Sequence, residues 1–221
     1  MMENRSTEDY IKAIYQLEPD QGRVSTTALA LRLGVSNASI TGMLKSLSNR
    51  DLVRYKRYGG VSLSPAGRRM ALRIVRRHRL WEMYLVRFLG YSWDRVHEEA
   101  ERLEHVTSVE LESQLDHALG YPESDPHGDP IPRIEGTIRR RREKSLAECP
   151  LGVHVVVKRI SDRNEEILRH ASALGLRLQT PLHVKQRQKF DGSMIVRVGR
   201  KNRQLSKALA EAVFVELRRA R

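Results

Sequence analysis

The sequence predicts an α+β fold, because helical and strand-like patterns occupy different parts of the chain. From Thr7 to about Leu119, apolar residues recur mostly at helical spacing, with one short alternating stretch between them. From Gly152 onward, apolar and polar residues alternate in several runs, with a single helical segment among them. We therefore expect a largely helical N-terminal part and a small C-terminal β-barrel with one helix.

The N-terminal elements form a recognisable pattern of short helices. Thr7–Leu17 is amphipathic, and a second helix is expected over Thr27–Leu33, where Gly34 ends it. A third helix opens at Ser36 and runs to about Asn49. Two short helices joined by a turn that contains glycine are typical of a helix-turn-helix.

The alternating stretch Leu52–Leu63 directly follows these helices. Its apolar and polar residues alternate on either side of Gly59-Gly60, which predicts a β-hairpin. A hairpin at this place is the wing of a winged helix-turn-helix. The wing carries three basic residues, Arg54, Lys56 and Arg57.

Three further helices are expected in the middle of the chain. The first begins at Pro65, since proline is tolerated in the first turn, and runs to about Leu89. The others span about Trp93–Glu104 and Ser108–Leu119, and residues 120–134 hold enough glycine and proline to exclude a helix. We expect the DNA-binding domain at 1–68, a helical domain at 69–138, a linker at 139–151 and the β-barrel at 152–221. The tetra-arginine run 139–142 is interpreted as solvated linker in preference to a phosphate contact.

Composition restricts the function classes. The net charge of +13 favours a polyanionic partner, either nucleic acid or an acidic membrane surface. No stretch approaches the roughly 18 apolar residues that cross a bilayer, and the N-terminus has no signal-peptide pattern. The single Cys149 excludes an internal disulfide framework and suits a reducing compartment. We expect a cytoplasmic protein that binds DNA and no membrane.

The predicted recognition helix offers few strong base readers. Its opening residues are small and weakly polar, so DNA shape is expected to contribute to specificity. Lys45 and the basic wing residues are better suited to phosphates. The predicted DNA contacts are Ser36, Asn37, Ala38, Ser39, Thr41, Lys45, Arg54, Lys56 and Arg57.

Acids and histidines gather at helical spacing in the middle segment. His97, Glu101, Glu104 and His105 fall on one face of a helix, His78 and Glu82 lie four residues apart on the preceding one, and Asp9 lies in the first helix. Stacked carboxylates need a compensating cation, and oxygen with imidazole donors suits Mn²⁺ or Fe²⁺. Spacing alone leaves an alternative open, in which these are solvated residues paired with nearby arginines.

Several motifs carry a resemblance to a known family. In the N-terminal 135 residues they are Glu8-Asp9-Tyr10-Ile11, Ala13-Ile14-Tyr15, Arg77-His78-Arg79-Leu80 with Glu82, Glu101-Arg102-Leu103-Glu104-His105 and Pro126-His127-Gly128-Asp129-Pro130-Ile131-Pro132. Through these motifs this part of the chain resembles the diphtheria toxin repressor family of metal-dependent regulators, in particular its manganese-responsive branch. The C-terminal block contains Arg159-Ile160-Ser161-Asp162, Leu174-Gly175-Leu176 and Phe190-Asp191-Gly192, through which it resembles the SH3-like FeoA domain.

The resemblance implies two metal sites. The primary site comprises Asp9, His78, Glu101, Glu104 and His105, and a second site comprises Glu82, Asp125, His127 and Asp162. Oxygen donors at Asp9 and Glu101 favour Mn²⁺, with Fe²⁺ as the other candidate. Lys12 stands where some manganese regulators have a glutamate, which counts against a tightly coupled two-metal cluster. His97 is interpreted either as an ancillary ligand or as a surface histidine.

The function that the resemblance implies is a manganese-dependent repressor of metal-homeostasis genes. It implies a homodimer, with the middle helices as dimerisation domain and a seam formed by Val106, Val109, Leu111, Leu115 and Leu119. Helical spacing leaves open the alternative that these five residues are ordinary core. The alternatives are an iron-responsive regulator of the same family and a winged-helix protein that binds DNA without metal. A metal-assisted hydrolase is disfavoured, because the chain has no H-E-x-x-H motif. We therefore expect no enzyme.

Overall fold

The computed structural model describes residues 2–139 and 143–218. The chain divides into two compact units. The first comprises Met1–Trp81, Glu101–Leu115 and Ile131–Ile138, and the second comprises Glu82–Ala100, Asp116–Pro130 and Arg139–Arg221. Among the described residues, no helix combines the length and the apolar character needed to cross a membrane.

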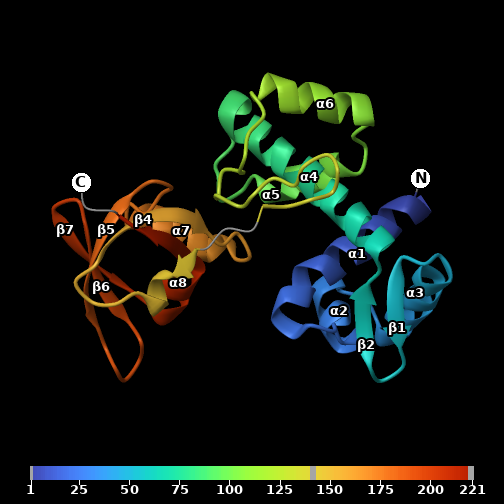
Figure 1. Ribbon diagram of the computed structural model, residues 1–221, viewed down its shortest axis with the longest axis horizontal. Helices are drawn as coiled ribbons and strands as arrows, with labels where there is room; N and C mark the ends of the chain where they lie inside the picture. The colour runs from blue at the N-terminus through green and yellow to red at the C-terminus, as the bar shows by residue number, and fades with distance from the viewer. Residues whose placement is uncertain (1, 140–142, 219–221) are drawn as a thin grey trace. The chain divides into compact units, whose positions relative to one another are not determined.

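The first unit begins with three helices, α1 (Met2–Gln21), α2 (Thr26–Leu33) and α3 (Asn37–Asn49). Ser25 caps α2 by accepting a hydrogen bond from a backbone N–H three residues on, and Ser36 caps α3 in the same way. All three helices follow the predicted order, although α1 is longer at both ends than its apolar pattern indicated. Figure 1 shows them gathered beside the hairpin.

The wing is an antiparallel hairpin of β1 (Val53–Lys56) and β2 (Gly60–Leu63). Val24 extends it by an isolated bridge to Val61, which ties the wing to the segment before α2. Gly60 has a φ of +72°, and a Cβ there would lie 2.8 Å from the carbonyl oxygen of Val24. Glycine is thus required at this turn by both conformation and close approach.

The core of the winged helix is formed by apolar residues of every one of these elements. Ile11 and Ile14 of α1 are fully buried. They belong to one cluster with Leu29 of α2 and Ile40 and Leu44 of α3. This core fixes the rotation of α1 about its axis and therefore the position of the polar residues that alternate with its apolar stripe.

The middle helices are α4 (Pro65–Leu89), α5 (His97–Glu104) and α6 (Val109–Ala118). Helix α4 has the predicted bounds, and α5 starts four residues after the predicted Trp93, because the residues before His97 form turns. Residues 120–134 contain no helix or strand apart from an isolated bridge between Ser124 and Pro130, as their glycines and prolines indicated.

The expected dimer seam needs a correction. Leu115 is 5% and Leu119 is 3% exposed within a single chain, so both are core residues and cannot face a partner. Val106, Val109 and Leu111 remain exposed, at 75%, 57% and 42%. Helical spacing could not separate the two groups, because core and interface residues share the same apolar character.

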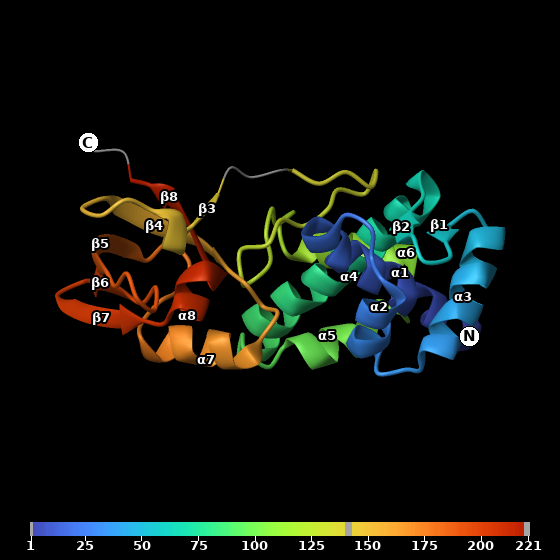
Figure 2. The ribbon, with the colours of Figure 1, turned by 90° about the horizontal axis from the view of Figure 1, so that it is seen from below.

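The second unit contains a six-stranded sheet in the order β3-β8-β4-β5-β6-β7, in which all neighbouring pairs are antiparallel. Its helices α7 (Glu165–Ala173) and α8 (Lys207–Ala212) contribute Leu168 and Leu209 to the buried core of the sheet. Figure 2 shows α7 along one side of the strands. The strands are β3 (Lys144–Ser145), β4 (His154–Ile160), β5 (Pro181–Arg187), β6 (Met194–Val198), β7 (Lys201–Leu205) and β8 (Val213–Leu217).

Two expectations for this region were wrong. The predicted linker 139–151 contains β3, which pairs with β8, and Leu146, which is fully buried in the core of the sheet. The expected single helix is accompanied by α8, which has only six residues and therefore gives too short a pattern to recognise. Arg140, Arg141 and Arg142 of the tetra-arginine run lie outside the described residues.

Candidate metal centres and DNA interface

The first unit brings polar side chains of three helices to one place. Helix α1 contributes two carboxylates and one lysine, and α4 contributes a histidine. Helix α5 contributes two carboxylates, and a histidine directly follows its last residue. The residues are Glu8, Asp9 and Lys12; His78; and Glu101, Glu104 and His105. All five residues predicted for the primary site are among them.

His105 connects α1 to the end of α5. Its Nε2 lies 2.9 Å from Asp9 Oδ1 and its Nδ1 lies 2.7 Å from Glu8 Oε2. Burial alone would lower the pKa of His105, but the hydrogen bonds to Asp9 and Glu8 and the charge of Glu104 raise it to about 9. The imidazole therefore carries a proton at neutral pH until a stronger cation replaces it.

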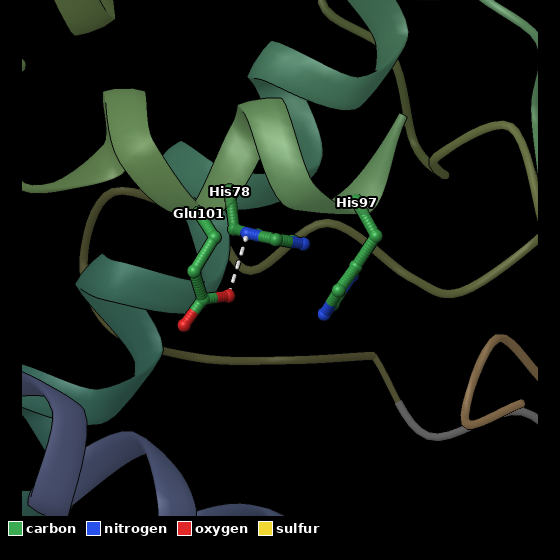
Figure 3. A group of neighbouring side chains, drawn as sticks. All are labelled: His78, His97 and Glu101. Carbon is green, nitrogen blue, oxygen red and sulfur yellow. Dashed lines mark ion pairs between the residues drawn. The ribbon is translucent and has the colours of Figure 1, made fainter. Parts of the chain in front are cut away.

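His78 of α4 meets both carboxylates of α5. Its Nδ1 lies 2.5 Å from Glu104 Oε2 and 3.8 Å from Glu101 Oε2. Figure 3 shows His78 and Glu101 approaching each other from their two helices, with His97 one turn before Glu101 on α5. The side chain of Glu104 is fully buried, whereas that of Glu101 is 39% exposed. A buried carboxylate needs compensating partners, and the imidazole of His78 is one of the groups in contact with Glu104.

The ammonium of Lys12 lies among these groups. Its Nζ is 2.7 Å from Glu101 Oε2, 2.7 Å and 2.9 Å from the two oxygens of Glu104, and 3.2 Å from His78 Nδ1. Only 5% of the Lys12 side chain is exposed. The sequence alternative paired these carboxylates with neighbouring arginines, but the positive charge beside Glu101 and Glu104 belongs to Lys12 of α1. Arg76 and Arg77 both bind Glu112 instead.

Three of the predicted primary ligands can meet on one ion. Asp9, Glu101 and His105 each offer a ligand atom, and these atoms lie within 4.8 Å of one another. Two oxygen donors and one imidazole nitrogen suit Mn²⁺ or Fe²⁺ better than the sulfur-rich sites of structural zinc. The residues thus fit a divalent cation in both chemistry and placement.

The second predicted site lies entirely within the second unit. Glu82, His127 and Asp162 each place a ligand atom within 4.8 Å of the others. His127 Nδ1 is 3.9 Å from Glu82 Oε2 and 4.0 Å from Asp125 Oδ1. The side chains of Glu82, Asp125 and His127 are all fully buried. All four predicted residues are therefore brought together.

His127 has the orientation of a metal ligand. Its Nε2 lies 2.6 Å from the carbonyl oxygen of Trp93 and donates to it, while its buried Nδ1 has no hydrogen-bond partner among the described residues. Burial would lower the pKa of His127, but the charges of Glu82, Asp125 and Asp162 raise it above its usual range. A carbonyl that fixes one ring nitrogen and leaves the other facing carboxylates is the usual arrangement around a metal-bound histidine.

The loop that carries His127 is fixed against β4. The backbone carbonyl of His127 accepts a hydrogen bond from Ile160 N at 2.9 Å. A Cβ on Gly128, which has a φ of +94°, would lie 2.2 Å from the carbonyl oxygen of Lys158. Asp125 Oδ1 accepts two backbone N–H groups of the same loop, so Asp125 also shapes it.

His97 contacts Glu82, one residue of the second site. Its Nδ1 lies 3.3 Å from Glu82 Oε1, and its side chain is 34% exposed. The two interpretations of His97, an ancillary ligand and a surface histidine, both stay predictions.

The predicted DNA contacts lie on α3 and the wing. Ser36, Asn37, Ala38, Ser39 and Lys45 are exposed and Thr41 is half-buried, while Arg54, Lys56 and Arg57 of the hairpin are exposed. Ser36 has a structural role as well, because its hydroxyl caps α3. A groove of about 500 Å³ between these elements is lined by Ser25, Thr26, Thr41, Lys45, Tyr55, Arg57, Tyr58 and Gly60.

Three residues support the candidate sites but were not predicted as site residues from the sequence. Glu8 holds His105 but has no distinctive spacing, and Lys12 was noted only as a departure from the family pattern. Arg23 supports the wing, since its guanidinium donates to the carbonyl oxygens of Gly59 and Gly60. No sequence signal marks Arg23, because its acceptors are backbone atoms more than thirty residues away.

A basic winged helix beside a buried cluster of carboxylates and imidazoles defines a class of protein, the metal-dependent DNA-binding regulators. The chain belongs to the iron-dependent repressor family, in agreement with the resemblance to the diphtheria toxin repressors. The family's N-terminal DNA binding domain matches residues 2–61, its metal binding and dimerisation domain matches residues 64–133, and the FeoA domain matches residues 144–217. This family consists of DNA-binding repressors, which agrees with the expectation that the chain is no enzyme.

Individual relatives support the same assignment. The iron-dependent repressor IdeR of Mycobacterium leprae is 31% identical over 170 residues, which cover 73% of this chain and 74% of the relative. The diphtheria toxin repressor of Corynebacterium efficiens is 30% identical and covers 96% of this chain and 95% of its own. A manganese-dependent transcriptional repressor solved in complex with manganese is 39% identical, with a TM-score of 0.88 and coverage of 95% and 98%.

Proposed function

We propose that the chain is a manganese-dependent repressor of metal-ion homeostasis genes, which acts in the cytoplasm as a homodimer on double-stranded operator DNA. The observation that carries this proposal is the convergence of Asp9, Glu101 and His105, since it joins the DNA-binding helices to α5 through potential metal ligands. The exposed basic wing and the solved manganese-dependent relative support it.

The donor set favours manganese over iron. Asp9 and Glu101 supply hard carboxylate oxygens, and neither candidate site contains a thiolate or thioether among the described residues. The relative IdeR of Mycobacterium leprae is an iron-dependent repressor, which makes Fe²⁺ the second candidate. The third candidate function is a regulator that needs no metal. The contact of Lys12 with Glu104 supports it, because an ammonium already compensates that carboxylate.

The proposed mechanism is a restriction of α1. A divalent cation supplies a positive charge that carboxylates and an imidazole from separate elements can share. Asp9 belongs to α1, whose apolar face is part of the winged-helix core, and His105 directly follows α5. Holding these two residues on one ion would orient the recognition helix for the major groove, so the metal would select the DNA-competent state.

The second site would act on the C-terminal domain. Asp162 follows β4 of the sheet, whereas Glu82 lies on α4 and His127 on the loop fixed to that strand. Sharing an ion would hold the FeoA-like domain to α4. This site would therefore contribute stability to the second unit, while the primary site would control DNA binding.

A metal titration of operator binding tests the proposal. Promoters of candidate metal transporters are incubated with the protein and Mn²⁺, Fe²⁺ under anaerobic conditions, or Co²⁺, and binding is measured by gel shift. We expect Mn²⁺ to promote binding at the lowest concentration and a chelator to reverse it. Iron as the stronger activator would favour the iron-responsive alternative, and binding unchanged by the chelator would favour the metal-independent one.

A further inference from the structure

The position of Lys12 within the primary cluster has a consequence for how many ions the cluster holds. Lys12 Nζ lies within 2.7–3.2 Å of Glu101, Glu104 and His78. Its side chain is 5% exposed and that of Glu104 is fully buried. An ammonium that lies against two carboxylates and an imidazole and has little contact with water is a built part of the site, unlike the mobile ammonium of a surface lysine.

A metal ion and this ammonium compete for the same oxygens. Glu101 Oε2 and Glu104 Oε2 both lie 2.7 Å from Lys12 Nζ. An ion that used these two oxygens would bind each at roughly 2.0–2.2 Å and would occupy the space of the Nζ atom. Asp9 and His105 are joined to each other instead, at 2.9 Å.

We propose that the Lys12 ammonium is a resident cation that fills one cation position of the cluster, so that the primary site takes a single divalent ion at Asp9, Glu101 and His105. This inference rests on the proposed function, because it presupposes that the cluster binds a metal. Lys12 also ties α1 to α4 and α5 before any metal binds, since His78 and Glu104 belong to those helices.

The inference is tested by counting Mn²⁺ ions per chain with native mass spectrometry and equilibrium dialysis. Lys12→Glu removes the cation and adds a donor oxygen, and we expect it to bind one more ion per chain than the natural protein. Arg5→Glu makes the same charge change at an exposed position of α1 and should leave the count unchanged. Equal counts for Lys12→Glu and the natural protein would overturn the inference.

A separate variant tests the proposed function in the same assay. Asp9→Asn removes a ligand of the primary ion, so the natural protein should bind one ion more than Asp9→Asn. If these two counts are equal, the primary site holds no metal and the proposed function fails, whatever Lys12→Glu does. If they differ and Lys12→Glu gains nothing, only the role of Lys12 is wrong.

Thermal unfolding of the metal-free protein gives a second measurement. Lys12→Met keeps the length of the side chain without its charge and leaves Glu104 buried with less compensation. We expect its Tm to fall by about 5–15 °C without metal and the difference to shrink when Mn²⁺ is added. An unchanged Tm would contradict the resident cation. If Lys12→Met does not fold, the ion count of Lys12→Glu prepared with Mn²⁺ still decides.

Discussion

His105 Nε2 lies 2.9 Å from Asp9 Oδ1, which connects the residue after α5 to the first helix of the winged helix. The two residues are separated by most of the N-terminal half of the chain, and their contact joins two candidate ligands, one on α1 and one directly after α5. Its behaviour with pH, metal and mutation therefore gives the sharpest tests of the account.

Protons should compete with metal at His105. Its pKa of about 9 means that metal binding at neutral pH must displace a proton, because only the unprotonated nitrogen is a ligand. The Mn²⁺ affinity of the primary site should thus rise about tenfold per pH unit from pH 7 towards 9. Titration calorimetry in buffers of different ionisation enthalpy measures both the affinity and the protons released. An affinity that is constant over this interval would contradict the assignment of His105 as a ligand.

Asp162→Asn should remove the ion of the second site without affecting the primary one. The change keeps the shape of the side chain but weakens a ligand that faces Glu82 and His127. We expect one Mn²⁺ fewer per chain and a smaller increase in Tm on adding Mn²⁺, with operator affinity less affected. Glu165→Gln, an exposed carboxylate at the start of α7, serves as the control. An unaltered ion count would show that Asp162 is no ligand.

Gly128→Ala should weaken metal binding at the second site, although Gly128 is not itself a ligand. The new Cβ would overlap the carbonyl oxygen of Lys158 at 2.2 Å, and the φ of +94° disfavours any side chain. We expect a loss of about 1–3 kcal/mol in the free energy of unfolding and a weaker second ion, because His127 moves with its neighbour. Chemical denaturation measures the first and ion counting the second. Gly199→Ala, also at positive φ but with open space around it, should bind its ions normally.

Arg57→Ala should weaken DNA binding without changing its sequence preference. Arg57 lines the groove between α3 and the wing and is exposed, which suits a phosphate contact. Affinity should fall by a similar factor on operator and unrelated DNA, and the slope of log K against log salt should decrease by about 1. Arg200→Ala, at the exposed turn after β6, provides a matched loss of charge. A selective loss on operator DNA would make Arg57 a base reader.

The elements with strong local patterns could be predicted from the sequence. Helix α4 has the expected bounds, and α2 and α3 start at their serine caps. The wing is the expected hairpin, although its turn covers residues 57–59 and Gly60 already belongs to β2. The missed elements are short and depend on distant partners. Strand β3 has two residues and exists only through its pairing with β8, and α8 has six. Neither length gives a measurable period.

The candidate ligands could be named, but their partners could not. Spacing placed Glu101, Glu104 and His105 on one face of α5, and the resemblance added Asp9. The Lys12 ammonium contacts both Glu101 and Glu104, and this contact depends on how α1 lies against α5. No local sequence pattern predicts that arrangement. The contact between Glu8 and His105 has the same origin. The candidate ligands could thus be named from local sequence patterns, whereas the residues that compensate their charges depend on tertiary packing.

Operator binding by Asp9→Asn is measured with and without Mn²⁺ by fluorescence anisotropy, beside the natural protein, to test whether metal controls the winged helix. Glu98→Gln, an exposed carboxylate on α5, is the control. We predict that Mn²⁺ raises the operator affinity of the natural protein and of the control by about tenfold or more, and that Asp9→Asn loses most of this gain while it remains folded. An equal gain with Asp9→Asn would contradict metal control of the winged helix through this residue.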